Sequence, residues 1–216
     1  GLVLQPHPNS WLAPEELGSC IPPYRPTFGK QDFINDRHRF FSFCPVKDVH
    51  CVDIGIPGWL RREDALKLYE IAYFADGHIL ELGTYQGLST AILAQAVQDA
   101  GEGRTITSIE HDPAAMAEAE RHLTDNGVKA VVQLICAEAV SYCRELIANR
   151  HTFALVFVDH SHTYQAVSEI CRLLPLLVPS GGFCLFHDFN DVRNNDAHDP
   201  EYGVSPADHD TLDPTL

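Results

Sequence analysis

The stretch His78–Thr90, HILELGTYQGLST, decides the fold. An apolar run contains a carboxylate at Glu81, glycines follow at positions 83 and 87, and the polar pair Ser89 and Thr90 comes next. This order predicts a buried strand, a glycine-rich bend and a helix with Ser89 or Thr90 near its cap. In open α/β sheets, a bend beyond the carboxyl end of a strand is where ligands bind.

Strand and helix patterns alternate on both sides of this stretch. Continuous apolar runs predict further strands at 104–110, 131–139, 153–160 and 179–189. Helical periodicity predicts helices at 61–75, 89–100, 112–127, 139–150 and 163–178. Apolar strands separated by helices indicate a mostly parallel sheet that is covered on both faces. The predicted fold class is therefore α/β, a doubly wound, Rossmann-like sheet.

Composition argues against several classes of partner. The chain has 30 acidic and 15 basic residues and a formal net charge of −15, which disfavours nucleic acid and anionic membrane surfaces. No apolar run reaches the length of a membrane-spanning helix. The seven cysteines are scattered, and no pair has the two-residue gap of a zinc knuckle or redox motif. The scattered, unpaired cysteines predict a reducing, cytoplasmic environment.

The residues around the bend indicate the chemistry of its ligand. GTYQGLS does not fit the G-x-G-x-x-G fingerprint of dinucleotide binders, and Glu81 just before Gly83 suits a cation better than a pyrophosphate. Glu110 ends the next strand, where it can accept hydrogen bonds from the two hydroxyls of a ribose. These residues therefore indicate a ligand that contains a nucleoside and a positive charge but no pyrophosphate. S-adenosylmethionine is such a ligand. The alternative is a glycine turn without a ligand.

Five segments together resemble a class I S-adenosylmethionine-dependent methyltransferase. They are ILELGTYQGLSTAIL, TSIEHDP, ICAEA, FALVFVDHSHTY and LVPSGGFCLFHDF. Over residues 56–191 they are most similar to small-molecule O-methyltransferases of the catechol, macrolide-sugar and cephalosporin-hydroxylase-like types. The resemblance implies that the loop surrounds the methionine part, that Glu110 binds the ribose, and that Ala137 and Glu138 flank the adenine. The implied cofactor-binding residues are Glu81, Gly83, Thr84, Tyr85, Gly87, Ser89, Glu110, His111, Ala137, Glu138 and Asp159.

Two further strand ends carry groups suited to acid–base and metal chemistry. The fourth strand ends at Asp159, with His160 and His162 close behind, and the fifth ends at His187 and Asp188. Neighbouring strand ends meet at one crevice, so these groups are expected to surround a common centre. Two carboxylates with one or two imidazoles could hold Mg²⁺ or another divalent cation. The alternatives are that Asp159 caps the following helix and that the histidines are buried for structural reasons.

The resemblance also implies roles for these groups. Asp159, His187 and Asp188 would be the metal ligands, and Asp159 and His162 the catalytic residues, with His162 standing where the catechol type has a lysine base. A histidine, with an unperturbed pKa of about 6.5, suits removal of a hydroxyl proton. A histidine at position 187 departs from an all-oxygen site, so either His187 ligates the metal or Asp188 does so with Asp159.

The ends of the chain give weaker signals. Residues 1–55 are rich in proline and aromatic side chains, which predicts an ordered arm that acts as a lid over the acceptor pocket or as a clasp in a homodimer. Residues 56–216 would form the S-adenosylmethionine-binding domain. The resemblance implies a helix and an antiparallel strand pair after the fifth strand. Few residues remain there, so we expect the last strands to be truncated, or the sheet to be completed by a partner chain.

The sequence therefore predicts an enzyme that methylates a small-molecule hydroxyl with assistance from a divalent metal. Trp59 and Tyr85 are candidates for the wall of the acceptor pocket. Two other classes stay open. One is a protein that binds S-adenosylmethionine without turnover. The other is a nicotinamide-dependent oxidoreductase. Such enzymes also have a doubly wound sheet, but this sequence lacks their usual G-x-G-x-x-G fingerprint.

Overall fold

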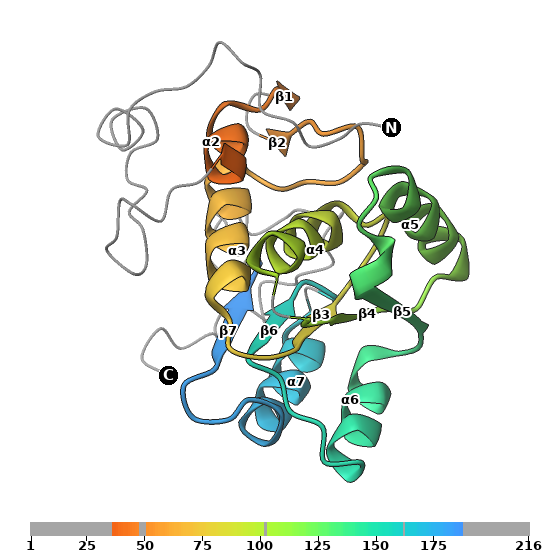
Figure 1. The fold of residues 1–216 in the computed structure, drawn as a ribbon. Coiled ribbons are helices and arrows are strands. Elements are labelled where there is room, and N and C mark those ends of the chain that lie inside the picture. Colours follow the sequence, from red (N-terminus) through yellow and green to blue (C-terminus); the bar gives the residue numbers. More distant parts are fainter. Residues whose placement is uncertain (1–35, 48–50, 102, 162, 188–216) are drawn as a thin grey trace.

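A five-stranded parallel sheet forms the centre of the protein (Figure 1). The computed structural model describes residues 36–47, 51–101, 103–161 and 163–187. The strand order is β5-β4-β3-β6-β7. The bounds are β3 (Ile79–Leu82), β4 (Ile106–Glu110), β5 (Val132–Cys136), β6 (Leu155–Val158) and β7 (Phe183–Phe186). The predicted doubly wound α/β fold and its five strands are confirmed.

Helices cover both faces of this sheet (Figure 1). One face carries α3 (Arg62–Phe74), α4 (Leu88–Ala100) and α5 (Pro113–Asp125), and the short helix η2 (Lys129–Val131) leads into β5. The other face carries α6 (Ala139–Ala148) and α7 (Tyr164–Leu177). None of the helices in the described part of the chain is long and apolar enough to cross a membrane.

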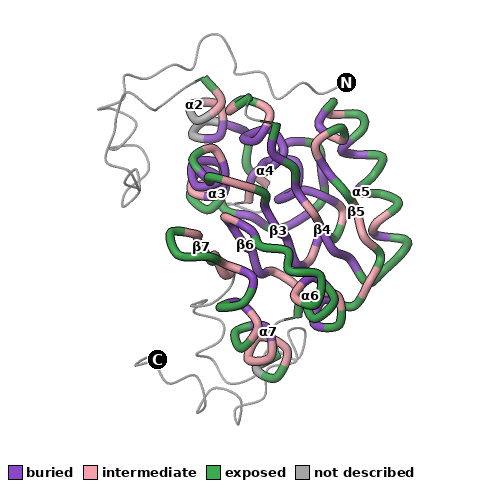
Figure 2. Tube along the Cα trace, turned by 60° about the horizontal axis from the view of Figure 1, so that its bottom comes forward, coloured by how far each residue is buried: buried purple, intermediate pink, exposed green. Residues whose placement is uncertain are grey.

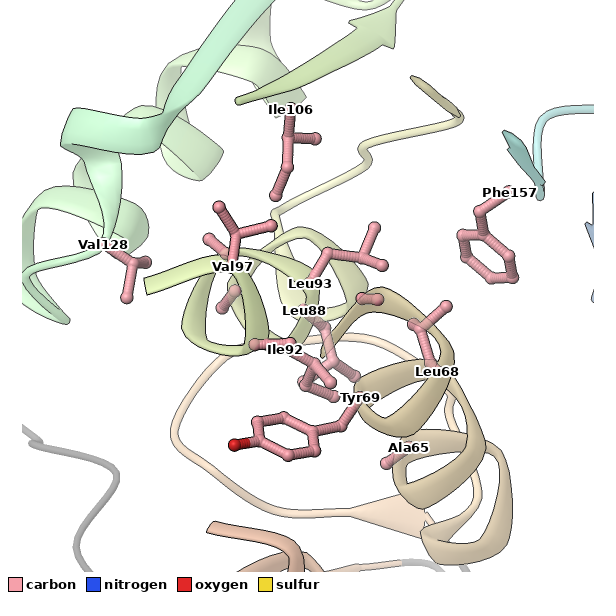
Figure 3. Close-up of a cluster of buried hydrophobic side chains, with 14 of the residues drawn as sticks. Ala65, Leu68, Tyr69, Leu88, Ile92, Leu93, Val97, Ile106, Val128 and Phe157 are labelled. Atoms are coloured by element: carbon pink, nitrogen blue, oxygen red, sulfur yellow. The ribbon is translucent and has the colours of Figure 1, made fainter. Parts of the chain in front are cut away.

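Alternation along the central strands divides the apolar side chains between two cores. Ile79 packs into the core beneath α3 and α4, whereas Leu80 and Leu82 pack into the core beneath α6 and α7. Figure 3 shows the first core, in which Tyr69 of α3 lies beside side chains of α4. In Figure 2, β3 and β6 are buried along their whole length, while β7 at the edge is only partly buried. The continuous apolar runs in the sequence reflect this two-sided burial.

Part of the predicted N-terminal arm packs onto the first core. It forms α2 (Asp36–Phe43) and an antiparallel pair, β1 (Val46–Lys47) with β2 (Cys51–Val52). Phe41 and Ile54 are buried in the same cluster as α3 and α4. Residues 1–35 lie outside the described residues, and the boundary at 55 and the lid or clasp stay predictions. Residues 188–216 also lie outside them, and so does the predicted shortening of the sheet.

The starts of α5 and α4 lie close to where they were predicted, but only α5 has a side-chain cap. Asp112 caps α5 by accepting a hydrogen bond from the Ala114 amide at 2.8 Å, as its position before a proline indicates. Helix α4 instead begins after Gly87, and no side chain caps it. Ser89 and Thr90 lie near this N-terminus, as expected, but neither side chain caps the helix, because both hydroxyls donate to the buried carboxylate of Glu81.

The order of the strands creates a single switch point. From β3 the chain proceeds outward through β4 and β5, whereas β6 and β7 lie on the opposite side of β3. The helices that follow β3 and β6, α4 and α7, therefore lie on opposite faces of the sheet, and in open α/β sheets ligands bind at such a point. The described residues among those predicted for the site lie at or near the carboxyl ends of β3, β4, β5, β6 and β7, at this edge of the sheet.

Candidate active site

The loops after β3 and β6 meet backbone to backbone at Gly83. This residue has φ +100°, and a Cβ placed on it would lie 2.0 Å from the carbonyl oxygen of Asp159. The approach is fixed by hydrogen bonds from the Asp159 amide to the Leu82 carbonyl, at 2.8 Å, and from the Gly83 amide to the Ile109 carbonyl, at 2.9 Å. Only glycine fits here, for both conformational and steric reasons. The first glycine of the bend therefore brings the two sides of the switch point together.

Glu81 is buried beneath the glycine loop and surrounded by hydroxyl groups. Its carboxylate accepts hydrogen bonds from Ser89 at 2.5 Å, Thr90 at 2.5 Å and Ser108 at 2.6 Å, and Thr84 lies 2.5 Å from Ser108. The side chain is fully buried. These hydrogen bonds join β3 and β4 to the start of α4, and they therefore hold the two ends of the glycine loop in place. The predicted role of Glu81 toward the methionine part of the cofactor stays a prediction.

Burial controls the ionisation of this carboxyl group. Removal from water raises the pKa of Glu81 to about 7, although the hydroxyls of Ser108, Ser89 and Thr90 act in the opposite direction. The nearby charge of Asp159 adds to the increase in pKa. Glu81 is thus close to half-protonated at neutral pH.

Replacement of Glu81 by glutamine should remove a pH dependence of stability. The folded state holds a proton on Glu81 up to about pH 7, whereas the unfolded chain releases it near the ordinary pKa of glutamic acid. The folded state therefore binds more protons in this window, and the free energy of unfolding falls as pH rises through it, by on the order of 3 kcal/mol. Urea unfolding of wild type and Glu81→Gln between pH 5 and 8 measures the difference. The exposed Glu145→Gln should keep the wild-type slope; an unchanged slope in Glu81→Gln would refute this assignment.

Glu110 holds the glycine loop from the end of β4. Its Oε2 accepts a hydrogen bond from the Tyr85 amide at 2.7 Å, and its Oε1 accepts from the His111 and Asp112 amides at 2.9 Å each. Tyr85 has φ +46°, an uncommon conformation for a residue other than glycine, and this hydrogen bond stabilises it. A carboxylate has about four acceptor positions, so Oε2 keeps one for a ligand hydroxyl. The exposed ring of His111 lies beside the same carboxylate, with Nδ1 3.0 Å from Oε1.

Glu138, predicted beside the adenine, caps α6. Its two oxygens accept hydrogen bonds from the Val140 amide at 2.9 Å and the Ser141 amide at 2.8 Å. Partial burial by itself would raise the pKa of Glu138, but these helix amides bring it below its ordinary value. The Glu138 carboxylate is therefore held by the first amides of α6. The Ala137 amide donates to the Glu110 carbonyl at 3.0 Å, which ties the two loops together.

A cleft of about 260 Å³ opens beside Glu138, between the first turns of α6 and α7. It is lined by Glu138, Val140, Arg144, Thr163, Gln165, Ala166 and Glu169. Glu138, which the resemblance implies beside the adenine, is among these lining residues.

Asp159 and His187 are brought together across the ends of β6 and β7. The Oδ1 atom of Asp159 lies 3.2 Å from Nδ1 of His187, and both side chains are mostly buried. Asp159 does not cap α7, because Thr163 occupies that position. His162 and Asp188 lie outside the described residues. Within the described ranges, no group of three or more histidine, cysteine or acidic side chains could hold a metal ion.

An exposed aromatic pair stands next to the glycine loop. The rings of Trp59 and Tyr85 stack with centroids 5.9 Å apart and an interplanar angle of 29°. Their exposed fractions, 66% and 43%, are high for such large apolar side chains. Both residues therefore offer a flat apolar surface beside the glycine loop, and their role as a pocket wall stays a prediction.

Sequence reasoning missed two residues that shape this site. Ser108 donates to Glu81 from β4, and the available signal was a polar residue on a buried face, two positions before Glu110. His122 contacts the carbonyl of Gln86 from α5 at 2.8 Å, and nothing in the sequence of that amphipathic helix indicated it.

The fold and the polar groups at its switch point define a Rossmann-like domain of the methyltransferase type. The model of the Methyltransf_24 family, a methyltransferase domain, matches residues 80–189, just over half of the chain. The chain belongs to this family of methyltransferase domains, which confirms the resemblance inferred from the motifs. No curated protein sequence matches the chain significantly.

Solved structures share the fold. An O-methyltransferase from Bacillus cereus in complex with SAH is 19% identical, with a TM-score of 0.52 over 63% of this chain and 62% of that one. Cofactor-bound Rv0187 from MTB is 22% identical, with a TM-score of 0.52 over 61% and 58%. A SAM-dependent methyltransferase from Agrobacterium tumefaciens is 14% identical, with a TM-score of 0.50 over 56% and 42%. The chain thus spans 42% to 62% of the length of these proteins, less than two thirds in each case.

Proposed function

We propose that this protein transfers a methyl group from S-adenosylmethionine to a hydroxyl of a small molecule. Membership of the methyltransferase family supports the reaction class. The observation that carries the choice of cofactor is Glu110, whose carboxylate fixes Tyr85 of the glycine loop and keeps an acceptor position for a ribose hydroxyl. The loop between Gly83 and Gly87 lacks the spacing that would receive a pyrophosphate.

Different residues of the chain bind the methionine part, the ribose and the adenine of the cofactor. The methionine part lies along Gly83, Thr84 and Gly87, above the buried carboxylate of Glu81. The ribose lies against Glu110, and the adenine lies by Ala137 beside the cleft at Glu138. Because Glu81 is near half-protonated in the free protein, a cationic ligand above it favours its ionised form. His111, Ser89 and Asp159 complete the predicted set.

Methyl transfer requires an aligned nucleophile and a base. The acceptor oxygen forms a bond to the methyl carbon while the carbon–sulfur bond breaks, and the electron pair of that bond stays on sulfur to give S-adenosylhomocysteine. The hydroxyl proton passes to His162, which follows the end of β6. Trp59 and Tyr85 form one wall for the acceptor. The Asp159 carboxylate contacts His187 and supplies negative charge beside the reacting centre.

A divalent cation, Mg²⁺ or a transition metal, is the second element of the proposal. Asp159 and His187 present a carboxylate and an imidazole at one point, and Asp188 is the third predicted ligand. This donor set fits such an ion, with Mn²⁺ favoured more by the imidazole than Mg²⁺ is. When bound there, the ion would lower the pKa of the acceptor hydroxyl.

Asp159→Asn should eliminate any stimulation by divalent cations while preserving the contact with His187. The amide keeps the shape of the carboxylate but loses the charge that attracts the ion, and affinity for the metal should fall by about 10-fold or more. Turnover is measured in EDTA and at increasing Mg²⁺ or Mn²⁺. Equal stimulation in wild type and variant would place the metal elsewhere, and the absence of stimulation in wild type would remove the metal from the proposal.

The proposed reaction is tested with S-adenosylmethionine carrying a labelled methyl group and a panel of sugars, polyketides and phenols. Label in an acceptor, with S-adenosylhomocysteine as the second product, supports the proposal. Cofactor binding without transfer to any hydroxylated compound would favour a non-catalytic binding protein. The homodimer, the cytoplasmic location and the absence of nucleic-acid and membrane partners stay predictions.

A further inference from the structure

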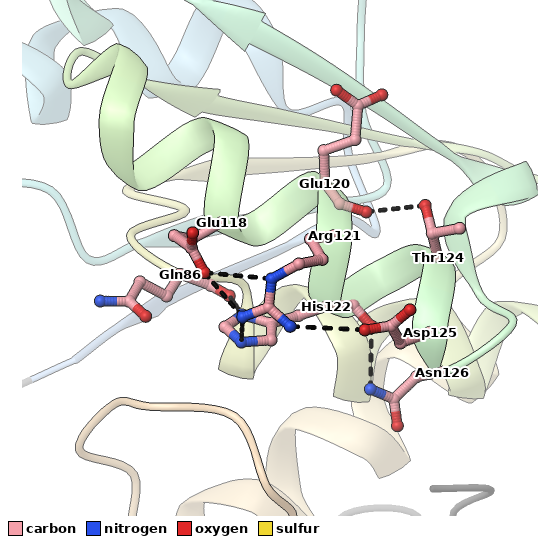
Figure 4. A network of polar contacts seen from close by, with 8 residues as sticks. All are labelled: Gln86, Glu118, Glu120, Arg121, His122, Thr124, Asp125 and Asn126. Carbon is pink, nitrogen blue, oxygen red and sulfur yellow. Dashed lines mark hydrogen bonds and ion pairs between the residues drawn. The ribbon is translucent and has the colours of Figure 1, made fainter. Parts of the chain in front are cut away.

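We propose that His122 of α5 is a positioning residue for the cofactor loop and acts through the backbone carbonyl of Gln86. The inference rests on the proposed function, because it concerns the same loop. His122 is buried, and its Nδ1 lies 2.8 Å from the Gln86 carbonyl oxygen (Figure 4). Gln86 lies between Tyr85 and Gly87, at the centre of the bend that receives the methionine part.

Arg121 determines which ring nitrogen of His122 carries the proton. Its Nη2 lies 2.9 Å from Nε2 of His122. A guanidinium group can only donate hydrogen bonds, so Nε2 must accept and must lack a proton. The proton of the neutral ring therefore lies on Nδ1, where it donates to the Gln86 carbonyl. The bond to the loop thus has a defined direction.

Acidic neighbours on α5 hold Arg121 in this position. Its Nη2 and Nε lie 2.6 and 3.2 Å from Oε2 of Glu118, and its Nη1 lies 3.4 Å from Asp125 (Figure 4). These contacts are exposed and contribute little to stability by themselves. Their effect is to orient the guanidinium toward the histidine ring.

Other contacts leave the bend little freedom. The peptide group between Gln86 and Gly87 is fixed at both ends, because its N–H donates to the Thr84 carbonyl at 2.9 Å and its C=O accepts from His122. One turn earlier on α5, Ala119 lies against Gly87, where an added Cβ would come within 3.3 Å of the alanine Cβ. Helix α5 therefore orders the loop before a ligand arrives, which lowers the entropic cost of binding.

Two substitutions separate the hydrogen bond from the packing. His122→Phe keeps a ring of similar size but removes the donor, and leaves the Gln86 carbonyl without its partner. His122→Asn places an amide N–H close to the position of Nδ1–H and should restore the bond. We expect the dissociation constant for S-adenosylhomocysteine to rise by about 5- to 30-fold in His122→Phe and to stay within about threefold of wild type in His122→Asn.

A control on the same helix is Thr124→Ala, which loses a hydrogen bond to the Glu120 carbonyl and does not contact the loop. It should bind S-adenosylhomocysteine as wild type does. A purely structural role for His122 would lower the melting temperature of His122→Phe without changing cofactor affinity. Wild-type affinity in His122→Phe, or equally weak binding in His122→Phe and His122→Asn, would overturn the inference.

Measurements on the free protein keep this test separate from the proposed function. The ¹⁵N shifts of the His122 ring should report the tautomer with the proton on Nδ1. Hydrogen exchange at the Gly87 amide should be about 10-fold faster in His122→Phe and near the wild-type rate in His122→Asn. If wild type fails to bind S-adenosylhomocysteine, the proposed function fails while these two readouts still decide the role of His122. The opposite tautomer, or unchanged exchange in His122→Phe, would overturn it.

Discussion

Replacing Gly83 with alanine should abolish binding of S-adenosylhomocysteine and destabilise the domain by more than about 3 kcal/mol. The new methyl group would stand 2.0 Å from the Asp159 carbonyl oxygen, and both atoms are held by backbone hydrogen bonds between neighbouring strands. Relief of this clash would separate the loops after β3 and β6, on which the proposed cofactor site depends. Thermal unfolding should show a loss of roughly 10 °C in melting temperature, and calorimetric titration should show no binding.

Gly127→Ala is the matched control for this substitution. Gly127 also has a positive φ, +72°, but no heavy atom lies within 4 Å of the position its Cβ would take. Its replacement should cost only the conformational penalty of a left-handed residue, about 1–2 kcal/mol, and leave cofactor binding intact. Equal destabilisation by the two substitutions would mean that the close approach at Asp159 is not what requires glycine.

His162→Ala should reduce turnover by about 10²- to 10⁴-fold, with the affinity for S-adenosylhomocysteine changed by less than about twofold. A general base acts on the acceptor and not on the cofactor, so removal of the imidazole should affect the chemical step alone. Single-turnover kinetics with an acceptor identified by the labelled-methyl screen give the rate. The expected increase of the wild-type rate with pH, as the imidazole loses its proton, should disappear in the variant.

His151→Ala makes the same chemical change at the opposite edge of the sheet. His151 is an exposed residue between α6 and β6 and therefore lies near the amino end of that strand. Its replacement should leave turnover unchanged. A decrease of less than about threefold in His162→Ala would remove this residue from the mechanism and leave the proton to another group at the crevice.

The strands and helices could be predicted because their signals are local. β3 and β6 are buried on both faces, so their sequences are continuous apolar runs, and Asp112 with Pro113 marks the start of α5. The start of α4 was predicted to within one residue, but its hydroxyl side chains do not cap it, because a tertiary contact overrides their local preference for a cap. Ser89 and Thr90 donate to Glu81, which is close in space but eight and nine residues away in the chain.

The candidate site was predictable in position but not in its interactions. Strand ends indicated where Glu81, Glu110 and Asp159 would gather, since parallel strands present their carboxyl ends at one edge. The sequence could not show that Glu81 would be enclosed by hydroxyls or that Glu138 would turn back onto α6. Those outcomes depend on distances between separate elements. The contact of His122 with Gln86 is of the same kind, because it joins α5 to a loop 36 residues earlier.

The most direct test of the proposed cofactor site is calorimetric titration of the purified protein with S-adenosylhomocysteine, with a nicotinamide dinucleotide titrated in parallel. We predict one site with micromolar affinity for S-adenosylhomocysteine and no binding of the dinucleotide, because Glu110 offers an acceptor to a ribose and the glycine loop offers no place for a pyrophosphate. Binding of the dinucleotide alone would contradict the proposal in favour of an oxidoreductase. Binding of neither compound would mean that the loop between β3 and α4 is a turn in the sheet without a cofactor.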